Sequence, residues 1–511
     1  MIRLTTDTPQ FFSDIGEVLR LFYGDVTISP ERGDVRVSHT HSEAGGVWSD
    51  TFTLEHAKFH GNALETDAAL CEHIQGNRSS LSATLNTPVA QRHDPLHYKR
   101  LMKRAVKTAC YTLMTRAHDK RPPWGSLTGV RPQKLLDELL EEGLTPDAAL
   151  SVLTGRFDLR PDKARLLLDI HKAQATLPKP TPSDVNVYIG IPFCASRCAY
   201  CTFSAGEAQN AKLIPAYIDA LTHEMTRCAK MLDEHSKPDA QFRLRAAYMG
   251  GGTPTALSAP QLDQVLRVAT EAFPGAPEWT VEAGRPDTIN REKLAVLKSH
   301  GVTRISINPQ SFYDETLSAI GRAHTVSDTL RAFSLAREMG FDNINMDLIA
   351  ALPCEDEAMF AESLSRTLKL KPESVTVHTL AIKRASKLRQ EGYGIANTAA
   401  ASSASRMVDL ARLALSEAGY APYYIYRQKY MADNLENVGY ALAGKVCRYN
   451  VDVMQETTRT LAMGAGAISK WLFEQEPRIR RAPNVADIRA YIARVDEMIG
   501  RKRELIGGIG Q

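Results

Sequence analysis

The sequence has no long uninterrupted run of apolar residues. Charged residues break every apolar stretch well before the roughly 20 residues that a membrane-spanning helix needs. Residues 1–7 contain neither an apolar signal core nor a lipidation motif. We therefore expect a protein without a membrane span that stays in the cytoplasm.

The number of cysteines and the net charge are also low. The 511 residues include 8 cysteines, which is too few for a disulfide framework, so thiols would be available to metals in a reducing compartment. The formal net charge of +3 gives no reason to expect nucleic acid as a partner. With 43% hydrophobic and 24% charged residues, the composition is that of an ordinary globular protein with room for several domains.

Three domains are expected, at residues 1–180, 184–385 and 386–511. The first opens with short alternating segments and then turns helical, which predicts an N-terminal α+β domain. Its basic stretch from 89 to 134 has eleven Lys/Arg against two Asp/Glu and a helical period. This stretch is either a solvated helix face or a surface for an anionic substrate. Arg131, in a turn-rich loop, is a further candidate for binding a carboxylate.

A linker with three prolines, Leu177–Ser183, separates the first domain from the second. Beyond about residue 390 the strand and helix alternation ends, and a helix near Ser403–Ala418 leads into a loop-rich aromatic segment. A C-terminal, mainly helical domain is therefore predicted. The small residues of 463–469 favour close packing over substrate contact.

The middle of the chain alternates apolar strands with helical patterns. The predicted strands are Val185–Ile191, Ala246–Met249, Trp279–Ala283, Arg304–Ile307, Asn343–Ile349 and Ser374–Leu380. Six β/α units in succession predict an α/β fold, with a parallel sheet curled into a partial (β/α)6 barrel. In such folds the chemistry lies at the carboxyl ends of the strands.

A cysteine motif follows the first of these strands directly. Cys194, Cys198 and Cys201 form a CxxxCxxC pattern on one loop. Three thiolates can hold three irons of a [4Fe–4S] cluster and leave the fourth iron open to S-adenosylmethionine, which the cluster reduces to release a 5′-deoxyadenosyl radical. The alternative is a zinc site, which needs four ligands and usually a second cysteine pair. No second pair is nearby, so the cluster is favoured.

Unusual residues follow the other strands as well. The glycine run after the second strand would let a ligand approach the backbone, and we expect its N–H groups to bind a carboxylate. Polar residues stand where a buried strand prefers apolar ones, at successive strand ends around one mouth. These are Glu282, Gln310, Arg322 and Asp347. Each alone could be a capping or salt-bridge residue, but their shared location favours a binding site.

Taken together, the motifs YxxIPFCxxxCxYC, GGGTPT, VEAGRPD, NPQSF, GRAH and MDLIAALP resemble the oxygen-independent coproporphyrinogen III oxidase family of radical S-adenosylmethionine proteins, and its HemZ branch in particular. The resemblance runs from about Val185 to Lys470. It implies that Cys194, Cys198 and Cys201 bind the cluster. It also implies a set of residues around S-adenosylmethionine: Tyr188, Tyr200, Gly251, Gly252, Thr253, Glu282, Gln310, Arg322 and Asp347.

The resemblance further implies the reaction, which is decarboxylation of two propionates of coproporphyrinogen III to vinyl groups without oxygen, in haem biosynthesis. The substrate would be a tetrapyrrole, and electrons would come from a donor such as flavodoxin or ferredoxin. Its four propionates would suit the basic stretch and Arg131.

Two positions depart from the established decarboxylases of this family. Phe203 stands where they have a further cysteine, and Gly190 where they have a histidine before IPFC. Phe203 matches the HemW-type relatives, which are understood as haem chaperones, so a haem carrier is an alternative. His378, His324 and Cys447 are candidate haem ligands, each with a structural role as the other explanation. Another radical modification of tetrapyrroles, by methyl transfer or ring opening, also stays open.

Overall fold

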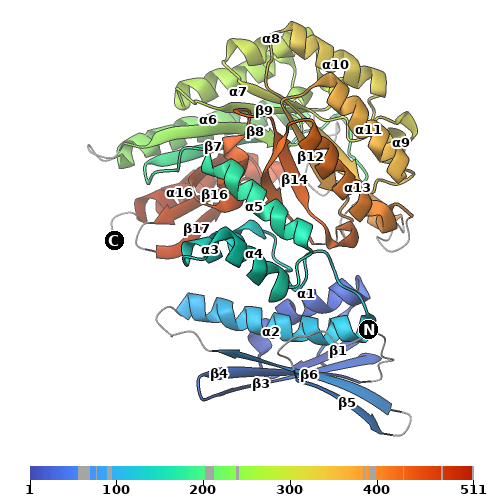
Figure 1. Ribbon diagram of the computed structural model, residues 1–511. Helices are drawn as coiled ribbons and strands as arrows, with labels where there is room; N and C mark the ends of the chain where they lie inside the picture. Colours follow the sequence, from blue (N-terminus) through green and yellow to red (C-terminus); the bar gives the residue numbers. More distant parts are fainter. Residues whose placement is uncertain are drawn as a thin grey trace. The chain divides into compact units, whose positions relative to one another are not determined.

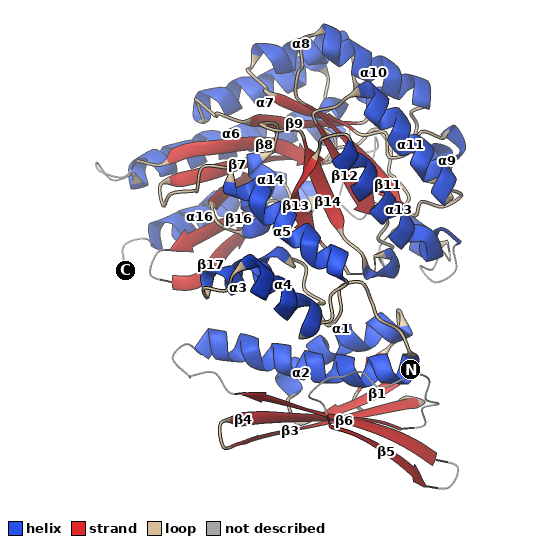
Figure 2. Cartoon of the chain, viewed as in Figure 1, coloured by secondary structure: helices blue, strands red, loops and turns tan. Residues whose placement is uncertain are grey.

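The computed structural model describes residues 1–55, 69–75, 78–88, 95–201, 212–236, 241–383, 386–391, 399–429, 431–473 and 476–508. They form two compact units, 1–168 and 169–511 (Figures 1 and 2). In the part of the chain that is described, no helix is both long and apolar enough to cross a membrane.

The first unit is a mixed sheet with helices. Its elements are β1 (Ile2–Thr6), α1 (Phe12–Tyr23), β2 (Ile28–Ser29), β3 (Val35–Ala44), β4 (Val47–Glu55), β5 (Ala69–Gln75), β6 (Arg78–Pro88), α2 (Pro95–His118), α3 (Gln133–Glu141), α4 (Pro146–Gly155) and most of α5 (Pro161–Ala175). The strand order is β2-β1-β3-β4-β6-β5. Residues 95–118 of the basic stretch 89–134 form α2, and this unit contains both strands and helices, as expected for the N-terminal part of the chain.

Apolar and polar side chains alternate along β4, which explains why α1 and α2 pack on one face of this sheet. Trp48, Phe52 and Leu54 are buried, and Phe52 and Leu54 join the core that both helices share. Thr51 and Thr53, which point to the other face, pair with hydroxyls of β6 at 2.8 and 2.7 Å. Since successive side chains of a strand point to opposite faces, one strand supplies both a core face and a polar face.

The second unit is built on an 11-stranded sheet. Its first part consists of β7 (Asp184–Ile191), α6 (Ile214–His235), β8 (Arg243–Gly251), α7 (Ala259–Ala272), β9 (Trp279–Gly284), α8 (Arg291–Ser299), β10 (Arg304–Ile307), α9 (Asp314–Ala319), α10 (Val326–Glu338), β11 (Ile344–Ala350), α11 (Glu357–Leu370) and β12 (Ser374–Thr379). Strands β7 to β12 lie side by side in sequence order, and each pair is parallel. All six predicted strands and the partial barrel are confirmed.

The residues after 386 differ from the expected mainly helical domain. They form α12 (Lys387–Gln390), α13 (Ala399–Glu417), β13 (Ala421–Tyr426), β14 (Asn437–Ala441), α14 (Arg448–Gln455), β15 (Arg459–Met463), β16 (Ile468–Phe473), β17 (Glu476–Pro483), α15 (Ile488–Ala493) and α16 (Val495–Gly507). β14 joins β12 and β15 joins β7, so these strands extend both edges of the barrel sheet. Aromatic and β-branched residues explain the strands, because they favour a pleated surface.

Glu278, just before β9, fixes the start of α14. Its carboxylate accepts the backbone N–H groups of Arg448 and Tyr449 at 2.7 and 2.9 Å. The first N–H groups of a helix have no partner within the helix, so a carboxylate there stabilises it. Tyr449, in the first turn, is thereby held against β8, where its ring stacks on Tyr248 at a centroid distance of 4.5 Å.

Candidate functional site at the carboxyl ends of the barrel strands

The three motif cysteines lie on the loop that follows β7, and all are half-buried. Burial raises the pKa of the Cys194 thiol, and negative charge on Cys201 and Cys198 raises it further. Cys194 Sγ lies 3.6 Å from Thr253 Oγ1, so the cysteine loop meets the glycine loop after β8.

Three soft thiolates on one short loop fit an iron–sulfur cluster by the chemistry of the donor set. As the chain stands, no three Cys, His, Asp or Glu side chains among the described residues are close enough together to bind a metal ion. The segment 202–211, including Phe203, lies outside the described residues.

The glycine loop after β8 packs on the cysteine loop. Gly252 N–H donates to Ile191 O at 2.8 Å and Thr253 N–H to Phe193 O at 2.7 Å. A Cβ on Gly252 would lie 2.5 Å from the oxygen of Phe193, so only glycine fits this approach. The expectation that the glycine N–H groups bind a carboxylate is thus corrected for Gly252, whose N–H is bonded to the end of β7.

Glu282, at the end of β9, is a half-buried carboxyl that faces the glycine loop. Burial raises its pKa to about 7, although a hydrogen bond from Tyr248 opposes the rise. The Tyr248 hydroxyl lies 2.5 Å from Glu282 Oε1. A Cβ on Gly250 would come within 2.8 Å of this carboxyl group, so glycine leaves the space that Glu282 fills.

Tyr188, on β7, belongs to a cluster of three tyrosine rings. Its ring lies 6.3 Å from that of Tyr248 and 6.4 Å from that of Tyr449, with interplanar angles of 18° and 19°. Burial raises the pKa of the Tyr188 hydroxyl, and the charge of Glu282 adds to this. Sequence reasoning found Tyr188 but missed Tyr248 and Tyr449. Tyr248 and Gly250 are two residues apart on one strand, so they lie on the same face of the sheet. This spacing could have identified Tyr248 from the sequence.

Gln310 and Asp347 meet between β10 and β11. The backbone N–H of Gln310 donates to Asp347 O at 2.9 Å, and Gln310 has a φ of 68°, in the left-handed region. Its side-chain oxygen is buried and has no hydrogen-bond partner among the described residues. A buried amide oxygen without a partner is costly. It is therefore an acceptor that a ligand could satisfy.

Asp347, on β11, is a half-buried carboxyl. Burial by itself would raise its pKa, but the hydrogen bond and charge of His378 outweigh burial and hold the pKa below its usual range. Asn345 Nδ2 donates to Asp347 Oδ1 at 2.7 Å, and His378 Nε2 lies 3.5 Å from Oδ2. The charge of Asp347 in turn raises the pKa of Glu282, which brings the two carboxyl groups into one site.

Arg322 connects this site to the cysteine loop. Its guanidinium donates to Tyr200 Oη at 3.2 Å and to Gly284 O at 3.4 Å. Burial would lower the pKa of Arg322, but negative charge on Tyr200 and Cys198 raises it above its ordinary value. The geometry thus brings every polar residue predicted from the strand ends into contact with another member of the site or with the loops beside it.

Two of the three candidate haem ligands are buried. Cys447 and His324 have 0% and 2% of their surface exposed. Cys447 Sγ lies 3.5 Å from a Glu278 oxygen at the start of α14, and His324 Nε2 lies 3.3 Å from Pro309 O. His378 is more exposed but contacts Asp347 and Tyr426. These contacts favour structural roles for Cys447 and His324.

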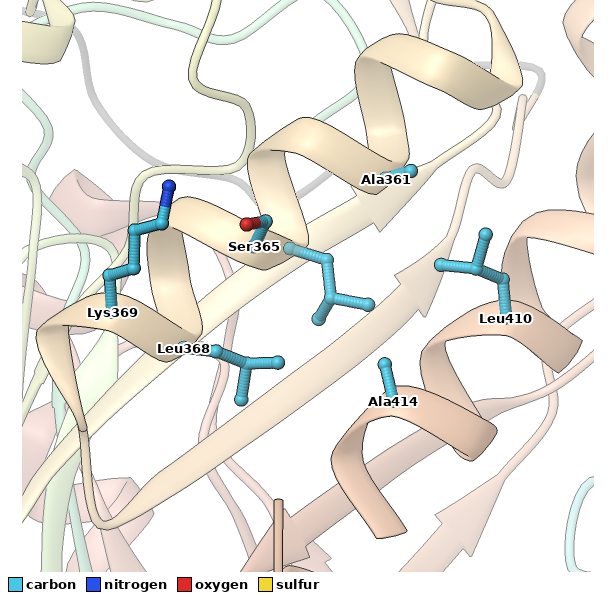
Figure 3. A pocket seen from close by; sticks show the side chains of 7 residues that line it. Ala361, Ser365, Leu368, Lys369, Leu410 and Ala414 are labelled. Atoms are coloured by element: carbon cyan, nitrogen blue, oxygen red, sulfur yellow. The ribbon is translucent and has the colours of Figure 1, made fainter. Parts of the chain in front are cut away.

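A groove of about 460 Å³ lies between α11 and α13 (Figure 3). Its lining is apolar except for Ser365 and Lys369. None of the predicted site residues lines it, so the groove does not belong to the strand-end site.

Comparison with known proteins agrees with this geometry. Residues 188–366 match the model of the radical SAM superfamily. The oxygen-independent coproporphyrinogen-III oxidase-like protein HemZ of Bacillus subtilis is 42% identical over 74% of this chain and 76% of its own length. The haem chaperone HemW of the same organism is 35% identical over 39% of this chain and 51% of its own length.

Among solved structures, coproporphyrinogen III oxidase (HemN) from Escherichia coli is 23% identical with a TM-score of 0.49, covering 66% of this chain and 73% of that one. Members of the radical SAM superfamily use a [4Fe–4S] cluster and S-adenosylmethionine. The long match to HemZ, together with the cysteine loop and the strand-end residues, shows that this chain belongs to the oxygen-independent coproporphyrinogen-III oxidase-like family of radical SAM proteins.

Proposed function

We propose that this chain decarboxylates coproporphyrinogen III to protoporphyrinogen IX without oxygen, in haem biosynthesis. The observation that carries the proposal is that the cysteine loop packs on the glycine loop, which Glu282 faces, at one end of the barrel. When bound, the cluster and S-adenosylmethionine supply a 5′-deoxyadenosyl radical that removes a hydrogen atom from a propionate side chain. An electron donor such as flavodoxin or ferredoxin would reduce the cluster.

The roles of the site residues belong to the same proposal. Cys194, Cys198 and Cys201 would hold the cluster. S-Adenosylmethionine carries an ammonium group and ribose hydroxyls, which need hydrogen-bond acceptors. It also carries a carboxylate, which needs a cation. Glu282 and Asp347 would supply half-buried acceptors, and Arg322 would supply the cation. Further residues expected around S-adenosylmethionine are Tyr188, Tyr200, Gly251, Gly252, Thr253 and Gln310.

One contact favours the second candidate, a haem chaperone that keeps the cluster. Gly190 stands where the established decarboxylases of the family have a histidine, and here the turn at 463–467 packs against it. A Cβ on Gly190 would lie 3.3 Å from Met463 O, and a Cβ on Gly464 would lie 2.5 Å from Gly190 O. A larger side chain at position 190 is therefore disfavoured, and the 35% identity to HemW agrees with this alternative.

The test is an anaerobic turnover of the cluster-reconstituted chain with reductant, S-adenosylmethionine and coproporphyrinogen III. Mass spectrometry follows the tetrapyrroles and 5′-deoxyadenosine, and Cys198→Ala and Cys228→Ala serve as the inactive and matched control variants. We expect protoporphyrinogen IX with one 5′-deoxyadenosine per propionate lost. Unchanged coproporphyrinogen with tight haem binding would support the chaperone, and a tetrapyrrole of another mass would indicate methyl transfer or ring opening.

A further inference from the structure

Arg285, just after β9, is a buried cation beside the cysteine loop. Only 3% of its surface is exposed. One guanidinium nitrogen, Nη1, donates to the carbonyl of Ser196 at 2.8 Å and also lies 3.9 Å from Cys198 Sγ. Ser196 lies between two of the motif cysteines, so a single side chain contacts both the backbone of that loop and one of its sulfurs.

A carboxylate holds this guanidinium in place. Nε of Arg285 lies 3.2 Å from Asp287 Oδ1, and Nη2 lies 3.4 Å from Oδ2. Asp287 therefore binds the two guanidinium nitrogens that do not face the cysteine loop. This contact fixes the guanidinium plane, and Nη1 stays directed at Ser196 and Cys198. The planar fork of arginine allows this, whereas the ammonium of lysine is a point charge that cannot span both partners.

We propose that Arg285 positions the cysteine loop and raises the reduction potential of the cluster, with Asp287 as its opposing charge. This inference rests on the proposed cluster at Cys194, Cys198 and Cys201. One added electron makes a cluster more negative, and a buried cation with a hydrogen bond to a ligand sulfur stabilises that reduced state. Removal of the cation disfavours reduction, whereas removal of the Asp287 charge favours it.

Removal of either charge should therefore shift the reduction potential in opposite directions. A merely structural role of the two residues does not predict such opposite shifts. Arg285→Gln removes the cation, and Asp287→Asn leaves the cation without its counter-charge. Arg285→Lys keeps the charge but loses part of the contacts. The matched control is Arg245→Gln: Arg245 is also buried, but it lies at the start of β8, where it binds Asp452 at 2.7 Å.

The experiment measures iron per chain in each reconstituted protein and then the midpoint potential by an anaerobic redox titration followed by electron paramagnetic resonance. We expect Arg285→Gln to lower the ratio of reduced to oxidised cluster at a fixed potential at least tenfold, which is 59 mV for a one-electron couple. Arg285→Lys should lie nearer to the unsubstituted protein, Asp287→Asn should shift the other way, and Arg245→Gln should match the unsubstituted protein.

An iron-loaded Arg285→Gln protein with an unchanged potential would overturn the proposal, as would equal shifts in the Gln and Lys variants. If Arg285→Gln fails to hold iron, the sign of the Asp287→Asn shift decides: an upward shift supports the proposal and no shift overturns it. Failure of the unsubstituted chain to take up a cluster would overturn the cluster site itself, so the two failures are distinguishable.

Discussion

The hydroxyl of Tyr217, on α6, donates a 2.6 Å hydrogen bond to the carbonyl of Gly190 near the end of β7. The same hydroxyl accepts the N–H of Ala465 at 3.1 Å. One phenol thus joins a barrel helix, the strand that leads into the cysteine loop and the turn after β15. The end of β7 is fixed by residues far away in the sequence.

Replacement of this phenol should weaken the fold at that end. In Tyr217→Phe the Gly190 carbonyl and the Ala465 N–H lose a buried partner, which costs about 1–3 kcal/mol. We expect the free energy of unfolding in urea to fall by that amount. Tyr313→Phe, at a half-buried ring, is the control, and equal stability of the two variants would contradict the role of the hydrogen bond.

A buried ion pair between α6 and α16 supports the same turn. Glu224 Oε1 lies 2.6 Å from Lys502 Nζ, and both side chains are fully buried. Glu224 Oε2 also accepts the Gly464 N–H at 2.8 Å. Glu224→Ala leaves a buried ammonium without its counter-charge, so the free energy of unfolding should fall by about 3–5 kcal/mol.

The double variant Glu224→Ala/Lys502→Met should recover part of this loss, because no unpaired charge then remains buried. Denaturant unfolding of the single and double variants measures the coupling between the two residues. Glu497→Gln, in an exposed pair with Arg494, should cause a much smaller change. Strictly additive losses for Glu224 and Lys502 would mean that the pair does not stabilise the fold as a unit.

Glu282 makes stability depend on pH. Burial raises its pKa from 4.5 to about 7, so the folded state favours the neutral carboxyl. The stability due to this group is fully present below pH 4.5 and is lost as the pH rises through about 7. Glu282→Gln, which cannot ionise, should gain up to about 3 kcal/mol over the unsubstituted protein between these limits.

Unfolding in urea at pH 5 and pH 8 measures this change. The difference in unfolding free energy between Glu282→Gln and the unsubstituted protein should grow with pH. The difference for Glu271→Gln, at an exposed carboxylate on α7, should stay constant. A constant difference for Glu282→Gln as well would show that this carboxyl is already ionised at pH 5.

The sequence predicted the barrel well because each strand there is a short apolar run followed by a helical pattern. Val185–Ile191 was assigned within one residue of β7, and the strand ends then located Glu282, Gln310 and Asp347. The C-terminal strands were harder to recognise. β13 contains consecutive tyrosines without alternation, and its place beside β14 depends on long-range pairing that local patterns do not carry.

Contacts between segments that are distant in the sequence also explain which features of the site the sequence does not predict. The glycine N–H groups were assigned to a ligand, because the sequence does not show that Gly252 and Thr253 reach Ile191 and Phe193. Tyr449 could not be connected to Tyr188 from spacing, since α14 is held beside β8 by residues distant in the sequence, such as Glu278 and the Arg245–Asp452 pair. Residue types at strand ends were predictable, but their partners were not.

The most direct test of the account is the iron and sulfide content of the anaerobically reconstituted chain and of its Cys194→Ala, Cys198→Ala and Cys201→Ala variants, with Cys228→Ala as the control at a buried cysteine of α6. A [4Fe–4S] site predicts about four irons and four sulfides per chain in the unsubstituted protein and in Cys228→Ala. Each motif variant should lose most of this iron. Equal iron in all five proteins, or zinc in place of iron, would contradict the account.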